Sequence, residues 1–502
     1  MRKASKIAAK QAKLLVALLA GLPLGACGSG KDALTVVTIG SPASPFEKTA
    51  RLSPPARLVR AATVEGLVGF DEQGQIVPAL ADRWIVTDDG LSYIFRLRDG
   101  TWADGTPLTA QSLRTALRET MAGLRGMPLA LDLSAITEIR VMTGRVIEIR
   151  LAAPMPNLLQ LLAQTELGLA EKGRGTGPMR LRRDGDVALL TAIAPEGRGL
   201  PAVEGWAGHV RPLRFIALPA EAAVAKFNSG EADILLGGRI EDFPLAGSVG
   251  LIRGTIQLDP VMGLFGLAVT DAAAEEKAFL AAPENREAVA MAIDRGALID
   301  AFGVGGWTAT TRVVGAGVAD DPGSIGERWA GLSIGERRAQ AAARVNRWRA
   351  AQPGAPTPVR LRLALPRGRG GDILFSRLRT DLSAIGIEAE QVGPDDEAEL
   401  RLVDAVARYP RVAWFMNQLS CLAERGLCNE DADRMAVQAQ RASDPAIRAE
   451  LLADAETALT KANVFIPFGP PIRWSLVRGD AHGFAANRWN IHPLMPMALL
   501  PK

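Results

Sequence analysis

Short hydrophobic stretches along the chain have the length and spacing of β-strands. LTVVTI at residues 34–39 is a β-branched run bounded by Gly40 and Pro42, which is typical of a buried strand. In YIFRLR at 93–98, apolar residues alternate with arginines, and VIEIRL at 146–151 alternates in the same way. This alternation predicts strands with one apolar face and one polar face.

Two further regions combine such strands with helical patterns. The strand-like PLRFIALP at 212–219 and ADILLGG at 232–238 flank a helical segment. The strand-like VRLRLALP at 359–366 and IEAEQV at 387–392 flank another. Strand–helix–strand order favours parallel sheets with right-handed crossovers, so we predict an α/β fold.

Polar residues mark the starts of several predicted helices. Thr109 precedes a helix with Leu113 and Leu117 on one side, and Asp294 precedes another. The stretch GLSIG at 331–335 fits the Gly-x-Ser-x-Gly pattern of a hydrolase nucleophile, but no strand precedes it, as that motif requires. Ser333 followed by Glu336 instead predicts a capping box that opens a helix.

The N-terminus has the layout of a secretory signal. MRKASKIAAKQAK carries five cations, and the apolar run after it is too short to span a bilayer. Leu24 to Cys27, LGAC, resembles the lipobox of bacterial lipoproteins, which implies cleavage after residue 26 and acylation of Cys27. Residues 1–26 are then the signal peptide and 27–33 a tether; an ordinary signal peptide with an incidental cysteine is the alternative.

Removal of residues 1–26 also changes the charge balance. The whole chain has 58 Lys+Arg against 55 Asp+Glu, and the signal takes five of the cations, which leaves 53 against 55. The nominal basicity therefore belongs to the targeting segment, and we expect no nucleic-acid partner. The remaining length suggests two or three domains.

The two other cysteines, Cys421 and Cys428, are predicted to form a disulfide, because an exported chain meets an oxidising compartment. A metal pair or a redox pair is the weaker alternative, since the spacing is not Cys-x-x-Cys and no histidine is near. The chain has three histidines and no His-Glu-x-x-His motif, so we expect neither a metal nor a cofactor.

Several blocks resemble one protein family in order along the chain. The most specific is EGLVGFDEQGQIVPALADRWIVTDDGLSYIFRLRDGTWADGTPLTA, and GTGPM, AAVAKFNSGEADI, NREAVAMAIDRGALI, LRTDLSAIGIEAE and AETALTKANVFIPF follow. They are similar to the family 5 extracellular solute-binding proteins of ABC importers, which include oligopeptide, dipeptide and nickel binders. The resemblance implies a type II-like periplasmic-binding-protein fold with two hinged lobes and an extra small α+β domain.

The resemblance also implies how the chain is divided. Lobe I would comprise 34–59, 176–263 and 472–502, with the extra domain at 60–175 and lobe II at 264–471. A cleft between the lobes would capture a peptide or peptide-like solute and deliver it to an ABC permease driven by separate ATPase subunits. We expect a monomer in the periplasm, anchored to a membrane by lipid, that catalyses no reaction. An exported lipoprotein hydrolase, or a sensor or scaffold with this fold, is the alternative.

The candidate ligand residues follow from the same resemblance. Peptide binders of the family use an aspartate for the ligand's amine, and the matching position is Asp404. The aromatic residues usual beside it are replaced by Leu402, Val403 and Ala405. Either Asp404 binds an amine in a sparser pocket or the ligand is not an ordinary peptide; a structural role at a strand end or turn is the third interpretation.

Five other residues are candidates for the cleft. Trp414 and Asn417 lie just past Asp404. Arg473 could bind a ligand carboxylate or join the lobes through an ion pair. Trp474, beside it, and Phe265, at the first crossing between lobes, could line the cleft or pack in the core.

Overall fold

The computed structural model describes residues 33–49, 51–247, 255–274, 278–352, 358–479 and 481–501. The predicted signal peptide at 1–26, the acylation site Cys27 and the tether up to residue 32 lie outside the described residues. Among the helices of the described part, none is long and apolar enough to cross a membrane.

The largest sheet, here called the main sheet, has seven strands in the order β10-β11-β12-β1-β13-β20-β14. Its centre is parallel, with β1 between β12 and β13, because α5 (Ala220–Asn228) carries the chain across from β12 to β13. The strands are β1 (Leu34–Ile39), β10 (Met179–Asp184), β11 (Val187–Ala192), β12 (Leu213–Leu218), β13 (Ile234–Gly238), β14 (Ile256–Leu258) and β20 (Trp474–Val477).

A second sheet has five strands in the order β17-β16-β18-β15-β19. Strands β17, β16 and β18 are parallel, whereas β15 pairs antiparallel with both β18 and β19. Helix α10 (Arg369–Ser383) makes the predicted crossover from β16 to β17. The strands are β15 (Gly263–Val269), β16 (Val359–Ala364), β17 (Ile387–Val392), β18 (Leu400–Val406) and β19 (Phe465–Gly469).

The small sheet is antiparallel, in the order β4-β5-β7-β6, and contains the alternating segments predicted at 93–98 and 146–151. Arg98 departs from that prediction: it is buried just after β5 and donates to Glu65 at 2.9 Å, because an ion pair satisfies its charge. The strands are β4 (Ala81–Val86), β5 (Ser92–Leu97), β6 (Ile136–Val141) and β7 (Val146–Leu151).

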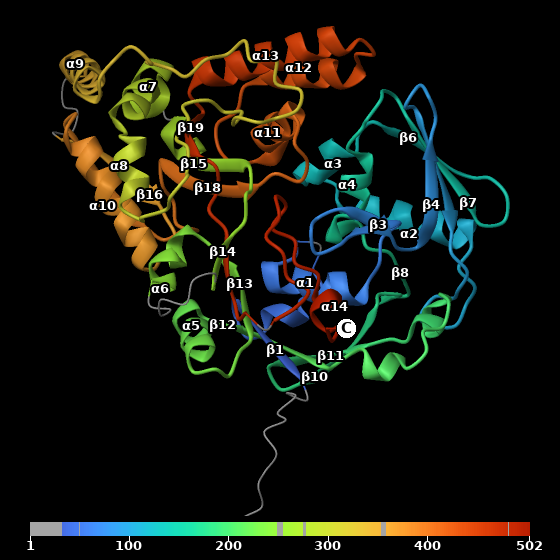
Figure 1. Ribbon diagram of the computed structural model, residues 1–502. Coiled ribbons are helices and arrows are strands. Elements are labelled where there is room, and N and C mark those ends of the chain that lie inside the picture. The colour runs from blue at the N-terminus through green and yellow to red at the C-terminus, as the bar shows by residue number, and fades with distance from the viewer. Residues whose placement is uncertain are drawn as a thin grey trace, which may run out of the picture. The chain divides into compact units, whose positions relative to one another are not determined.

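Helices cover these sheets, and α12 and α13 run side by side (Figure 1). The remaining helices are α1 (Pro54–Thr63), α2 (Ala110–Gly123), α3 (Pro128–Asp132), α4 (Leu158–Leu162), α6 (Phe243–Ala246), α7 (Pro283–Ala292), α8 (Arg295–Asp300), α9 (Ile334–Ala351), α11 (Val412–Gln418), α12 (Glu430–Arg441), α13 (Pro445–Ala462) and α14 (Leu494–Met497). The short elements are β2 (Val68–Phe70), β3 (Ile76–Pro78), β8 (Ala170–Glu171), β9 (Arg174–Gly175), η2 (Thr165–Leu167) and η8 (Cys421–Ala423).

The predicted helix starts are confirmed. The side chains of Thr109, Asp294 and Ser333 accept hydrogen bonds from the first turns of α2, α8 and α9. Ser333 and Glu336 form the reciprocal capping box, so this serine opens a helix and does not follow a strand. Among the described strands, none is shared between the main, second and small sheets. The exact lobe boundaries stay a prediction.

Candidate ligand-binding site

A cavity of about 410 Å³ lies where the ends of strands from two sheets meet. Thr38 of β1 and Leu236 and Gly237 of β13 contribute from the main sheet, and residues 404–408 contribute from β18 and the loop after it. Parallel strands β1 and β13 both end here, and ligands of open α/β sheets bind at the carboxyl ends of such strands. The volume falls within the range of small-molecule sites.

Gly237 allows β13 and β1 to approach closely at this edge of the main sheet. Its φ of +85° favours glycine, and a Cβ there would lie 3.0 Å from the hydroxyl of Thr38. A larger residue at 237 would therefore press on the cavity wall.

Asp404 joins the two sheets at this cavity. Its Oδ2 accepts from Arg239, just after β13, and from Arg473, just before β20, both at 3.0 Å. Its Oδ1 lies 2.8 Å from Nη1 of Arg473 as an ion-pair contact. The Asp404 side chain is 5% exposed, and burial alone would raise its pKa; the guanidinium groups of Arg473 and Arg239 outweigh burial and hold that pKa below its usual value. Asp404 is therefore an ionised carboxylate with two cationic partners.

A second ion pair also lines the cavity. Glu166 of η2 is 3.1 Å from Arg408, which also donates to Gln164 at 3.2 Å. Burial opposes ionisation of Glu166, but Arg408 and the nearby Arg57 lower its pKa to about 2. Both carboxylates that line the cavity are thus already engaged by arginines.

Arg425 differs from the other cavity arginines. Its Nη2 donates to Gln418 at 2.7 Å, and no carboxylate of the described residues forms a salt bridge with it. Burial and the charge of Arg408 lower the pKa of Arg425, which shows that its positive charge is poorly compensated.

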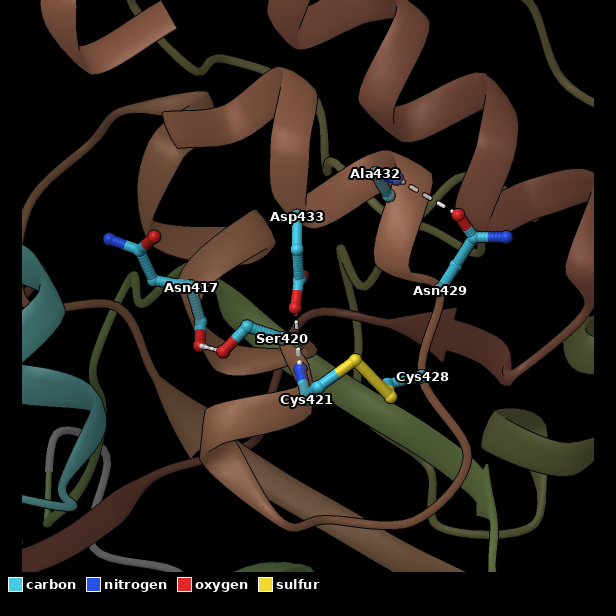
Figure 2. The surroundings of a disulfide bond; sticks show 7 residues. All are labelled: Asn417, Ser420, Cys421, Cys428, Asn429, Ala432 and Asp433. Carbon is cyan, nitrogen blue, oxygen red and sulfur yellow. Dashed lines mark hydrogen bonds between the residues drawn. A yellow bond between two sulfur atoms is a disulfide. The ribbon is translucent and has the colours of Figure 1, made fainter. Parts of the chain in front are cut away.

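The loop that carries Arg425 is closed by the disulfide between Cys421 and Cys428, which the structure confirms. The backbone N–H of Cys421 donates to Asp433 of α12 at 2.9 Å, and the side chain of Asn429 caps the same helix through Ala432 (Figure 2). Both ends of the loop are therefore fixed to α12.

Several buried polar atoms that line the cavity have no hydrogen-bond partner among the described residues. They are Thr38 Oγ1, Asp404 Oδ1, Trp414 Nε1, Arg425 Nε and His492 Nδ1. Buried polar groups are normally paired, so these atoms are available to bind a polar ligand or water in the cavity.

Three of the predicted ligand residues, Asp404, Trp414 and Arg473, line this cavity. Arg473 and Asp404 bind each other, which corresponds to the predicted ion-pair alternative for Arg473. Trp414 is buried on α11 with its indole against the neighbouring Phe415 at a ring distance of 5.0 Å.

The other three lie elsewhere. Asn417 donates to Asp132 at 2.8 Å beside a separate cavity of about 80 Å³. Trp474 is fully buried and donates to the backbone oxygen of Arg239 at 2.8 Å, so it positions that arginine from the core. Phe265 packs edge-on against Phe468 and lines a different cavity of about 300 Å³.

Sequence reasoning missed most of the charged lining, namely Arg57, Glu166, Arg239, Arg408 and Arg425. Arg239 had a usable signal, because it directly follows the strand predicted at 232–238, and the carboxyl ends of parallel strands are where ligands commonly bind. Arg408 and Arg425 lie in irregular loops, which hydrophobic patterns do not place.

Comparison with known proteins gives matches to one family. The model of the bacterial extracellular solute-binding proteins, family 5, middle region, matches residues 75–186. The probable deoxycholate-binding periplasmic protein YgiS of Escherichia coli K12 is 56% identical over 48 residues, 9% of each chain. The periplasmic murein peptide-binding protein MppA of the same organism is 26% identical over 263 residues, 46% of this chain and 47% of MppA. The alignments thus span less than half of these curated relatives.

The fold extends the likeness to nearly the whole chain. The crystal structure of Haemophilus influenzae OppA in complex with RPPGFSPFR superposes with a TM-score of 0.77 at 15% identity, covering 93% of this chain and 99% of that one. Neighbours of this kind are two-lobed periplasmic binding proteins, which confirms the predicted α/β fold of two lobes. The chain is thus similar to the family 5 solute-binding proteins at residues 75–186, and nearly the whole chain shares the fold of two-lobed periplasmic binding proteins.

Proposed function

We propose that the chain is the substrate-binding component of an ABC importer, which captures a peptide-like or other small solute and passes it to a permease. The observation that carries the proposal is the 410 Å³ cavity enclosed between the strand ends of two sheets and bridged by Asp404. A ligand in this position contacts both sheets at once, so it favours the closed arrangement of two hinged lobes.

The names of the relatives support this role. MppA is described as a periplasmic binder of murein peptide and YgiS as a probable binder of deoxycholate. These are ligands of different chemistry, so family membership supports capture of a small solute more strongly than it supports any one compound.

The place in the cell and the division of the chain belong to the same proposal. We expect a periplasmic monomer held at a membrane through acylated Cys27, with lobe I, the extra domain and lobe II divided as predicted from the sequence. Substitution Cys27→Ser in the full chain tests the anchor: the variant is expected in the soluble fraction without the mass of the lipid. Unchanged membrane retention and an unchanged lipid mass would contradict it.

Catalysis is not part of the proposal. Ser333, the serine of the hydrolase-like pattern, caps α9 and engages Glu336. Among the described residues, no group of His, Cys, Asp and Glu has the arrangement of a metal site.

The experiment combines identification and blockage of the ligand. Native mass spectrometry of the freshly purified protein should detect a bound small molecule, and the extracted compound, added back, should raise the melting temperature. Ala61→Trp places an indole at the cavity wall and should abolish this rise in melting temperature. Ala122→Trp, at an exposed position of α2, should keep it. Equal ligand responses of both variants would exclude this cavity as the site.

A further inference from the structure

The charges around the cavity are unbalanced. Five arginines line it against two carboxylates, and each carboxylate is held by arginine. The arginines are Arg57, Arg239, Arg408, Arg425 and Arg473, and the carboxylates are Glu166 and Asp404.

Acidic groups just behind the wall reduce the imbalance only in part. Glu241 lies 3.6 Å from Arg239, and Asp259 is bound by the Nε2 atom of His492 at 3.0 Å. Neither has a salt bridge to Arg408 or Arg425. Glu166 is shared by Arg408 and Arg57, and Asp404 by Arg239 and Arg473. The excess positive charge is therefore greatest at Arg425, which has no carboxylate partner among the described residues, beside the half-compensated Arg408.

Three of the unpaired polar atoms that line the cavity can donate to a ligand, whereas Asp404 Oδ1 is an acceptor that already lies 2.8 Å from Nη1 of Arg473. The indole N–H of Trp414 and the guanidinium N–H of Arg425 can only donate, and the hydroxyl of Thr38 can donate as well. A ligand that satisfies them must offer acceptor oxygens. Charge-assisted bonds from arginine to carboxylate or phosphate are the strongest of this kind.

We propose that the cavity binds a small solute with at least two carboxylate or phosphate groups, received by Arg425, Arg408 and Trp414. Asp404 then serves to hold Arg239 and Arg473 across the two sheets and does not receive a ligand amine. This proposal rests on the proposed solute-binding function and specifies its substrate class.

The disulfide loop supports the proposal by positioning Arg425. Leu427, in the same loop, donates its N–H to the backbone oxygen of Val269 at the end of β15 at 2.7 Å. The Cys421–Cys428 bond and the hydrogen bond from Cys421 to Asp433 hold the loop (Figure 2), and the hydrogen bond to Gln418 orients the Arg425 guanidinium before a ligand arrives. An arginine held in this way loses less entropy when it binds.

The test uses purified protein freed of bound compounds by dialysis from denaturant and refolding, at constant ionic strength. Thermal shift and calorimetry are measured with citrate, glutarate, glucose 6-phosphate, Glu-Glu, Ala-Ala and Lys-Lys. We expect the acidic compounds to raise the melting temperature and Ala-Ala and Lys-Lys to leave it unchanged. The melting-temperature shifts with citrate and glutarate, compared with the shift with glucose 6-phosphate, distinguish carboxylate from phosphate as the bound group.

Variants then assign the effect to the arginine. Arg425→Gln should weaken the best acidic ligand about 10- to 100-fold, because a charge-assisted contact is lost, and Arg425→Lys should recover part of the affinity. The same Arg425→Gln variant should melt at an equal or higher temperature without ligand, because a half-buried charge that has no carboxylate partner among the described residues is removed. Arg118→Gln, an exposed position on α2, removes the same charge outside the cavity and should bind as the parent does.

The possible failures are distinct. If Ala-Ala or Lys-Lys binds and the acidic compounds do not, the polyanion proposal is overturned and the solute-binding function stands. Unchanged affinity in Arg425→Gln also overturns it. If no compound of the panel binds and the native protein carries no small molecule, both proposals fail.

Discussion

Asp404 and Asp132 are both buried carboxylates between separate parts of the chain, yet their surroundings are opposite. Asp404 has two guanidinium partners, which hold its pKa low. Asp132, on α3, accepts from the neutral donors Tyr409 and Asn417 at 2.7 and 2.8 Å. Burial raises the pKa of Asp132 to about 6, and the two hydrogen bonds only reduce that rise.

The comparison shows that the kind of partner decides the protonation state of a buried acid. Two guanidinium groups in direct contact offset the desolvation of Asp404, whereas two neutral donors and the smaller effect of the Arg408 charge do not offset that of Asp132. Helix α11 lies between the two sites: Trp414 faces the arginine-lined cavity and Asn417 faces Asp132. Each site can therefore be perturbed from the same helix.

The largest effect is expected from Asp404→Asn. The change keeps the shape of the side chain but leaves Arg239 and Arg473 without their counter-charge, and breaking a buried pair costs about 3–5 kcal/mol of unfolding free energy. Urea unfolding measures the loss. A polyanionic ligand should still bind this variant, whereas a ligand whose amine sits on Asp404 should not.

A second substitution shows where that loss originates. In Asp404→Asn with Arg473→Gln, one of the two orphaned charges is also removed, so part of the lost stability should return. If the double variant is less stable by the sum of both changes, uncompensated charge is not the cause.

The disulfide loop follows α11, the helix that lies between the two sites, so it can also be used to perturb the cavity. Replacing both Cys421 and Cys428 by serine should lower the free energy of unfolding by about 2–3 kcal/mol, as expected for closing a loop of this size. It should also weaken a ligand bound at Arg425. Dithiothreitol should reproduce both effects in the parent protein and leave the double variant unchanged.

The raised pKa of Asp132 predicts a pH dependence of stability. Between about pH 4 and 6 the folded protein keeps the Asp132 proton that the unfolded chain releases, so the free energy of unfolding falls as pH rises. Asp132→Asn removes the titrating carboxyl group and with it this contribution to the pH dependence of unfolding free energy. The stability of the variant relative to the parent should increase by about 2–3 kcal/mol from pH 4 to pH 7.5.

Urea unfolding at both pH values measures the change for Asp132. Asp454→Asn on α13 is the control, because that carboxylate is exposed and should leave the parent's pH dependence in place. A parallel pH dependence in Asp132→Asn and the parent would show that Asp132 ionises normally.

The strands and helices were predictable because periodicity and capping are local. LTVVTI became β1 with both faces buried, and Ser333 formed its capping box with Glu336. Helix α11 was missed, since seven residues are too few for a helical period to show. Arg98 was predicted on a polar face, and only its partner Glu65, distant in sequence, explains its burial.

The site was less predictable for the same reason. Asp404 was found through the family resemblance, but its two arginines come from positions 165 and 69 residues away, and pairings over such separations leave no local pattern. Phe265 and Asp404 are neighbours across β15 and β18, yet Phe265 lines a different cavity. Which cavity a strand residue lines depends on the packing of other elements.

Tyr409→Phe gives the smallest and most selective test of the comparison. It removes the hydroxyl that donates to Asp132 and leaves the aromatic ring in place. The pKa of Asp132 should rise further, because the ionised form loses a donor. The loss of unfolding free energy should be about 1–2 kcal/mol at pH 7.5 and smaller at pH 4, where Asp132 is protonated in both proteins.

The same variant should bind a polyanion at Arg425 with the parent's affinity, because Tyr409 is not among the residues that line the larger cavity. An equal loss of stability at both pH values would mean that the hydroxyl acts through packing and not through the charge of Asp132. A loss that grows with pH would establish that the Tyr409 hydroxyl stabilises the ionised carboxylate of Asp132, a role that the guanidinium groups of Arg239 and Arg473 have at Asp404.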